Sequence, residues 1–131
     1  MKKQKFKGII AWDFDCVIAS YRRPFREDIL GKPDYEVIET MNYYWANSYY
    51  VLIYTGRENL IRLRVWLKKY KVKYNGINTN PCKYFNIAES YKPYFHVLVD
   101  DKSVNYHFSR NKKTSKELIK EINKVFKWSQ K

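Results

Sequence analysis

The stretch that decides the fold reads G-I-I-A-W-D-F-D and runs from Gly8 to Asp15. It is a short run of β-branched and aromatic residues that breaks into polar residues at its carboxyl end. Two later stretches repeat this pattern, Y-V-L-I-Y-T-G-R at Tyr50–Arg57 and F-H-V-L-V-D-D at Phe95–Asp101. Continuous apolar runs of this length are typical of parallel strands that are buried on both faces. The pattern predicts three strands, at Gly8–Trp12, Tyr50–Tyr54 and Phe95–Val99.

Amphipathic segments separate these strands. Asp34 follows Pro33 and can cap a helix. Within that helix one nearly all-apolar face is expected, whose residues recur at helical spacing: Val37, Ile38, Met41, Tyr44, Trp45 and Ser48. A second helix is predicted from Arg57 to Lys71, before a short strand at Lys73–Asn78. The expected buried stripe of this second helix consists of Leu60, Leu63, Leu67 and Tyr70.

Thr114 and Glu117 form a capping box that predicts the start of the last helix. The apolar face of that helix consists of Leu118, Ile119, Ile122, Val125 and Phe126. The order β-α-β-α-β…β-α predicts an α/β fold with a mostly parallel sheet and helices on both faces. We therefore expect a three-layer α/β/α, Rossmann-like architecture.

Length and composition narrow the functional classes. A chain of 131 residues fits one domain, residues 1–131, and the sequence leads us to expect neither a membrane span nor a secretion signal. Cys16 and Cys82 lie far apart and outside any C-x-x-C spacing, which favours a reduced, cytoplasmic compartment. The net charge of +13 favours anionic partners such as nucleic acid or phosphorylated small molecules, unless the basic side chains simply solvate helix faces.

Acidic residues end two of the predicted strands. Asp13 and Asp15 are two positions apart, so their carboxylates can face one small volume if the chain curls after the strand. In such a pair one carboxylate, here Asp13, can act as nucleophile and metal ligand and the other, Asp15, as acid and base, although a strand-end aspartate can also simply cap a turn. Asp100 and Asp101 are adjacent and repel each other, which favours a nearby hard cation such as Mg²⁺, unless they cap the following turn.

Groups that could bind a phosphoryl group lie next to the same strands. Thr55 and Gly56 follow the second strand, where a hydroxyl and backbone N–H groups suit phosphate oxygens, but T-G also suits a plain helix start. Arg57 could fork onto a second anion or a neighbouring carboxylate, or be an exposed first-turn residue. Lys92 precedes the Asp100 strand and could balance Asp13 and the phosphate, or be solvated.

Taken together, D-F-D-C-V-I, Y-V-L-I-Y-T-G-R, Lys92 and V-L-V-D-D resemble the four motifs of haloacid dehalogenase-like phosphohydrolases. The resemblance covers nearly the whole chain. Two shorter stretches, Gly31–Pro33 and Gly76–Pro81, are similar to those of a small bacterial and phage branch of that superfamily. The resemblance to this superfamily implies a Mg²⁺-dependent phosphatase with a Rossmann-like fold.

The resemblance also implies roles for single residues. Asp13 would be the nucleophile that forms an aspartyl-phosphate, and Asp15 would protonate the leaving oxygen, then activate water, with its carbonyl touching Mg²⁺. Thr55 would bind the phosphoryl group. Lys92, with Lys83 as the alternative, would steady nucleophile and phosphate. Asp100 and Asp101 would hold the metal, with the direct ligand left open between them.

Two features distinguish this chain from the family pattern. Cys16 stands where the family usually has glycine, so a turn with positive φ would be strained there. The gaps between motifs are too short for a large cap domain, which implies an open cleft. We therefore expect a substrate that is a nucleotide, a nucleic-acid end or another phosphate ester, with Arg22, Arg23 and Arg26 as candidate contacts. The alternative is a catalytically weak scaffold that binds nucleic acid.

Overall fold

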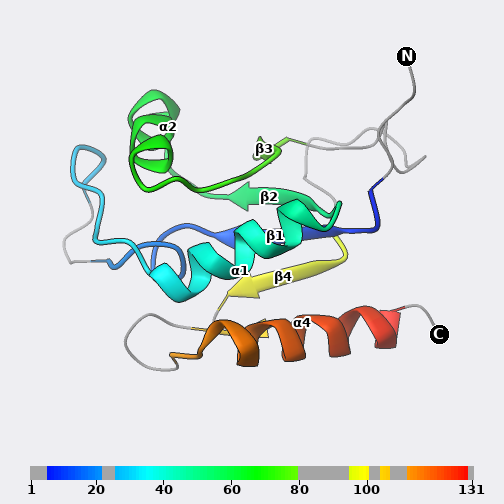
Figure 1. Ribbon diagram of the computed structural model, residues 1–131. Helices are drawn as coiled ribbons and strands as arrows, with labels where there is room; N and C mark the ends of the chain where they lie inside the picture. Colours follow the sequence, from blue (N-terminus) through cyan, green and yellow to red (C-terminus); the bar gives the residue numbers. More distant parts are fainter. Residues whose placement is uncertain (1–5, 22–25, 80–94, 101–103, 107–111, 130–131) are drawn as a thin grey trace, which may run out of the picture.

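The computed structural model describes residues 6–21, 26–79, 95–100, 104–106 and 112–129 of the chain (Figure 1). In chain order the elements are β1 (Ile9–Asp13), α1 (Tyr35–Ala46), β2 (Tyr50–Tyr54), α2 (Leu60–Lys69), β3 (Gly76–Ile77), β4 (Val97–Asp100), β5 (Val104–Asn105) and α4 (Ser115–Ser129). The strands form one sheet in the order β3-β2-β1-β4-β5, and each neighbouring pair is parallel. The fold is therefore α/β with a parallel sheet, in a Rossmann-like strand order.

β1 lies at the centre of this sheet, as its sequence indicates. Ile9 to Asp13 pair with Tyr50 to Tyr54 of β2, and Ile10 to Trp12 pair with Val97 to Val99 of β4. The first four residues of β1 are fully buried, because both faces of the strand are covered. The continuous apolar run is thus explained by burial on two sides.

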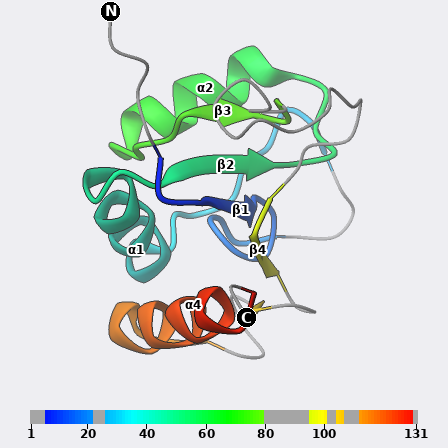
Figure 2. The same ribbon diagram turned by 90° about the vertical axis from the view of Figure 1, so that its right-hand side faces the viewer.

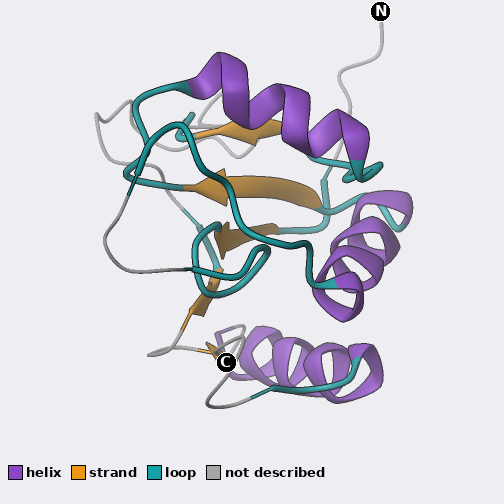
Figure 3. Ribbon diagram, turned by 90° about the vertical axis from the view of Figure 1, so that its left-hand side faces the viewer, coloured by secondary structure: helices purple, strands orange, loops and turns teal. Residues whose placement is uncertain are grey.

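The three described helices cover the same face of the sheet (Figures 2 and 3). Their apolar side chains share one core with alternate strand residues, among them Ile10, Trp12, Val51, Ile53, Val97 and Val99. The intervening residues Ile9, Ala11, Tyr50 and Leu52 are buried on the opposite face, where Phe6, Phe95 and Leu98 pack against them. A helical layer on that second face stays a prediction.

Helix starts were largely readable from local sequence. The Asp34 side chain accepts hydrogen bonds from the backbone N–H groups of Glu36 and Val37, at 3.1 and 3.3 Å, and so caps α1 as predicted. The Thr114–Glu117 capping box is also confirmed, with Glu117 N donating to Thr114 Oγ1 at 3.3 Å. The predicted face of α4 is correct, since Leu118, Ile122 and Phe126 are buried.

Several boundaries differ from the prediction. The second helix begins at Leu60 and not at Arg57, because the Asn59 side chain caps it by accepting from Arg62 N at 3.1 Å. Its buried stripe also includes Trp66, which the periodicity did not single out. In α1 the predicted face is too wide, since Trp45 is 42% exposed.

The strands show smaller differences of the same kind. β2 has the predicted bounds, β1 extends to Asp13, β4 starts at Val97, and β3 is reduced to Gly76–Ile77. β5 was not predicted, because two residues carry no readable alternation. No helix in the described ranges is long and apolar enough to cross a membrane.

Candidate active site at the carboxyl ends of the strands

Three of the predicted site residues lie where the parallel strands of the sheet have their carboxyl ends. Asp13 ends β1 and is paired with Tyr54, so Thr55 follows it on β2. Trp12 is paired with Val99, so Asp13 and Asp100 are the next residues on two neighbouring parallel strands. This edge is where α/β folds bind ligands, at the point where the strand order reverses. Lys92 and Asp101 lie outside the described residues, as do Lys83, Arg22 and Arg23.

Asp13 and Asp100 also belong to the same face of the sheet. Side chains alternate along a strand, and Trp12 and Val99 both join the core under the helices. The two aspartates therefore belong to the opposite face, and both are half-buried. Carboxylate oxygens on adjacent strand ends suit a hard cation such as Mg²⁺, which needs only one or two protein carboxylates. The described parts of the chain contain no cluster of three or more His, Cys, Asp or Glu residues that could hold a metal.

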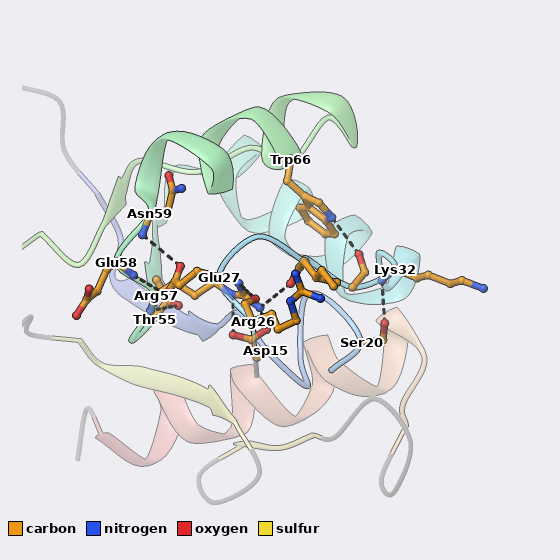
Figure 4. Close-up of polar contacts among 12 residues, drawn as sticks. Asp15, Ser20, Arg26, Glu27, Lys32, Thr55, Arg57, Glu58, Asn59 and Trp66 are labelled. Atoms are coloured by element: carbon orange, nitrogen blue, oxygen red, sulfur yellow. Dashed lines mark hydrogen bonds and ion pairs between the residues drawn. The ribbon is translucent and has the colours of Figure 1, made fainter. Parts of the chain in front are cut away.

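Asp15 makes a two-pronged ion pair with Arg57 (Figure 4). Arg57 Nε donates to Asp15 Oδ2 at 2.9 Å, and Arg57 Nη2 donates to Asp15 Oδ1 at 2.8 Å. The arginine side chain is only 4% exposed, whereas that of Asp15 is 21% exposed. Of the alternatives for Arg57, the neighbouring carboxylate is therefore its observed partner, and the exposed first-turn position is wrong.

Arg57 also contacts a loop that runs along α2. This loop, residues 26–31, is here called the strap. Arg57 Nη1 donates to the carbonyl oxygen of Arg26 at 3.2 Å, and Nη2 donates to that of Ile29 at 3.3 Å. Its guanidinium also lies 5.6 Å from the ring centre of Phe14. A single buried arginine thus joins the strap to the turn that carries Asp15.

Two side chains of α2 also hold the strap in place. Arg62 Nη1 donates to the carbonyl oxygen of Asp28 at 3.1 Å, and Trp66 Nε1 donates to that of Gly31 at 3.0 Å. A Cβ on Gly31 would lie 1.8 Å from the carbonyl oxygen of Ser20, so only glycine fits there. The strap is therefore anchored along the length of α2.

The Glu27 carboxylate occupies part of the anion-binding position that was expected before α2. Its carboxylate accepts hydrogen bonds from Glu58 N at 2.9 Å and from Asn59 N at 3.3 Å. These N–H groups precede the first turn of α2, where an anion is favoured. The protein thus supplies its own carboxylate at two of these donors. No sequence signal indicated Glu27, because the contact joins residues 31 positions apart.

Thr55 and Gly56 remain next to the strand edge. Asn78 fixes the Thr55 backbone, accepting from Thr55 N at 2.9 Å and donating to Thr55 O at 2.7 Å. Arg57 N donates to Thr55 Oγ1 at 3.1 Å. Gly56 is exposed, and no atom lies within 4 Å of the position that a Cβ would take. The T-G pair therefore combines a buried hydroxyl that is held in place with an exposed glycine.

The turn after β1 has the backbone conformation that the missing glycine suggested. Cys16 has φ of 71°, in the left-handed region. The carbonyl oxygen of Phe14 accepts from Ile18 N and Ala19 N, both at 3.0 Å, and Cys16 N donates to Ala19 O at 2.9 Å. The tight turn therefore contains a strained residue directly after Asp15.

Three groups with displaced pKa values lie in other parts of the molecule. Burial raises the pKa of Tyr106, as does its hydrogen bond to Asp34. Burial also raises the pKa of Tyr44, which donates to Asn123 Oδ1 at 2.8 Å between α1 and α4. Burial lowers the pKa of His96, just before β4. These groups support the fold rather than the strand-end site.

Comparison with known proteins supports the fold and gives no family. No protein-family model and no curated protein sequence matches the chain. A conserved protein from Bacteroides thetaiotaomicron has a similar solved structure, with a TM-score of 0.67, covering 89% of this chain and 90% of that chain. The sequence identity is 19%, so the similarity concerns the fold alone. The chain therefore has an α/β fold of the same kind as that protein.

Proposed function

We propose that this chain is a Mg²⁺-dependent phosphatase with a three-layer α/β/α, haloacid dehalogenase-like fold and no large cap domain. It hydrolyses phosphomonoesters through an aspartyl-phosphate on Asp13. The observation that carries the proposal is the register, because Asp13 and Asp100 end the neighbouring strands β1 and β4 and Thr55 follows β2, all at the carboxyl end of the sheet. Open α/β sheets bind their ligands at the carboxyl ends of the strands.

In the first step an Asp13 carboxylate oxygen attacks phosphorus, and the bond from phosphorus to the ester oxygen breaks. Asp15 gives a proton to that leaving oxygen. In the second step Asp15 takes a proton from water, which attacks the aspartyl-phosphate and releases inorganic phosphate. Asp13 is thereby restored as a carboxylate.

Thr55 and Gly56 bind the phosphoryl oxygens in this proposal. Because Arg57 N already donates to Thr55 Oγ1, the hydroxyl hydrogen of Thr55 is directed elsewhere, toward an acceptor such as phosphate. Asp13 and Asp100, with Asp101, would hold Mg²⁺, and Lys92 would steady the phosphate. When bound, Mg²⁺ supplies positive charge that offsets the repulsion between the Asp13 carboxylate and the phosphate.

The proposed substrate class follows from the small number of elements between β1 and β2. That segment contains only the turn, the strap and α1 in its described residues, so it offers no room for a cap domain. A phosphate at the end of a nucleotide or a nucleic acid is therefore compatible with the site.

Replacement of the nucleophile tests this function. Asp13→Asn should reduce hydrolysis of 4-nitrophenyl phosphate by roughly 10³-fold or more, because an amide cannot form the aspartyl-phosphate. Asp28→Asn is the control, since Asp28 is exposed and pairs with Arg26 in the strap. Activity that persists in a folded Asp13→Asn protein would exclude the mechanism.

A basic groove favours a second candidate function, nucleic-acid binding on this scaffold. The groove has a volume of about 500 Å³ and is lined by Arg64, Lys68, Lys71, Val72, Lys73 and Tyr74 at the carboxyl end of α2. Its lining contains four cations and no acidic residue, which suits a phosphodiester backbone.

Charge reversal in the groove tests that second function. A Lys68→Glu/Lys71→Glu protein should bind a single-stranded oligonucleotide more weakly, with a smaller dependence of affinity on salt. A Lys116→Glu/Lys120→Glu protein has the same net charge and is altered on the exposed side of α4. Equal losses in the two proteins would show that the groove has no specific role.

A further inference from the structure

We propose that Arg57 is a positioning residue, which orients the Asp15 carboxylate for proton transfer and does not bind the substrate phosphate. The inference rests on the proposed phosphatase function. It assigns to Arg57 a role different from the substrate contact that its place in the Y-T-G-R stretch suggests. Arg57 would act on the reaction only through Asp15.

The hydrogen bonds of the guanidinium carry this assignment. Nε and Nη2 form a fork on the two oxygens of Asp15, at 2.9 and 2.8 Å. Nη1 and Nη2 also donate to the carbonyl oxygens of Arg26 and Ile29 in the strap. These four contacts use four of the five N–H groups of an arginine. The side chain is 4% exposed, so its donors face the protein interior and not an incoming anion.

The fork leaves Asp15 able to act. Its side chain is 21% exposed, and each carboxylate oxygen has a second lone pair beyond the one that Arg57 uses, which can hold the proton that Asp15 transfers. A general acid must lie within hydrogen-bonding distance of the oxygen that it protonates, and an error of about 1 Å can cost roughly 10²-fold in rate. Asp15 sits in a tight turn next to Cys16, so its orientation depends on a partner outside that turn. Arg57 is such a partner, and the carbonyl oxygens of the strap hold its guanidinium in place.

A purely structural role is the rival explanation. In that case Arg57 would only join the strap to the turn, and its loss would affect folding without changing how the reaction depends on the leaving group. A phosphate-binding role is the other rival, and its loss would weaken binding of any phosphate. The two rivals and the proposal therefore predict different kinetics.

The test compares two aryl phosphates with good and poor leaving groups, 4-nitrophenyl phosphate and phenyl phosphate. The ratio kcat/KM reports the reaction up to cleavage of the ester bond, where Asp15 gives its proton. In Arg57→Ala we expect kcat/KM for phenyl phosphate to fall roughly 10²-fold. The fall for 4-nitrophenyl phosphate should be much smaller, because 4-nitrophenolate leaves without a proton. Inhibition by inorganic phosphate should not change.

Arg62→Ala is the matched control. This variant removes another hydrogen bond that holds the strap, the one from Arg62 to the carbonyl oxygen of Asp28. Arg62 has no hydrogen bond to Asp15 among the described contacts. It should preserve kcat/KM for both esters. Arg57→Lys is the second variant, to be used if the alanine protein does not fold. It keeps the charge but not the two-pronged geometry, and should show the same dependence on leaving group.

Three results would overturn the inference. Equal loss on both esters with weaker inhibition by inorganic phosphate would make Arg57 a substrate-binding residue. The same kinetics in Arg57→Ala and Arg62→Ala would make it a strap anchor only. A further loss on adding Arg57→Lys to an Asp15→Asn protein would show that Arg57 does not act through Asp15. Wild-type protein without phosphatase activity would instead overturn the proposed function, and this role with it.

Discussion

At the scale of single residues, Cys16 is the clearest departure from what its backbone prefers. Its φ of 71° costs an L-residue roughly 1–2 kcal/mol, and glycine avoids that cost. Glycine has more freedom in the unfolded chain, which offsets roughly 0.5–1 kcal/mol of the gain. We therefore expect Cys16→Gly to raise the free energy of unfolding by roughly 0.5–1 kcal/mol, as measured by urea denaturation.

Cys16→Ala is the control for that variant. It removes the thiol but keeps a Cβ at positive φ, so it should not show the gain. If the alanine and glycine proteins are equally stable, the backbone of the turn does not carry strain.

His96 makes the stability depend on pH. Its Nδ1 accepts a hydrogen bond from Ile9 N at 3.0 Å, which requires the nitrogen to be unprotonated. Burial lowers the pKa of His96 below its ordinary 6.5, so the unfolded chain takes up the proton more readily than the folded protein. The contribution of His96 to stability is thus complete above pH 6.5. It is lost as the pH falls through the lower folded-state pKa.

His96→Asn isolates this effect, because an amide oxygen can accept the same hydrogen bond without titrating. Between about pH 7 and pH 5 the wild-type melting temperature should fall more steeply than that of the variant. Parallel curves for the two proteins would show that His96 does not link protonation to folding.

At the scale of elements, the N-terminal end of α1 is held from two sides. Asp34 caps the helix with Oδ1, and its Oδ2 accepts a hydrogen bond from the hydroxyl of Tyr106, which follows β5. Asp34 is 3% exposed and Tyr106 is fully buried. Tyr106, the residue after β5, therefore helps to hold the cap at which α1 begins.

We expect Asp34→Ala to lower the free energy of unfolding by roughly 2–4 kcal/mol, since it removes a cap and leaves a buried hydroxyl without its partner. Thr114→Ala, at the exposed cap of α4, should cost only about 1 kcal/mol. In a double-mutant cycle with Tyr106→Phe, the combined loss should be smaller than the sum of the single losses. Additive losses would contradict a direct interaction.

At the scale of the whole molecule, the candidate metal site lies on the central strand β1 and its neighbour β4. A cation bound by Asp13 and Asp100 would hold β1 and β4 together, and so should stabilise the entire sheet. Mg²⁺ at ten times its Kd should add about 1.4 kcal/mol to the free energy of unfolding. We expect this as a rise in melting temperature in wild type that is lost in Asp100→Asn and kept in Asp28→Asn. The same rise in all three proteins would exclude this site.

Local sequence determined much of the fold and part of the candidate site. Continuous apolar runs placed β1, β2 and β4, because strands buried on both faces need apolar residues at every position. Asp34 and the Thr114–Glu117 box marked two helix starts, because caps are formed by residues close in sequence. The positions of Asp13, Thr55 and Asp100 at strand ends followed from the same runs.

Tertiary structure alone decided what those residues contact. Arg57 pairs with Asp15 across 42 positions of sequence, and Glu27 accepts from Glu58 N across 31 positions. No local periodicity encodes such contacts, because they depend on how the strap and the turn after β1 pack against residues distant in sequence. Sequence patterns therefore specify which side chains reach the strand ends, whereas docking of distant segments decides which donors and acceptors are already paired there.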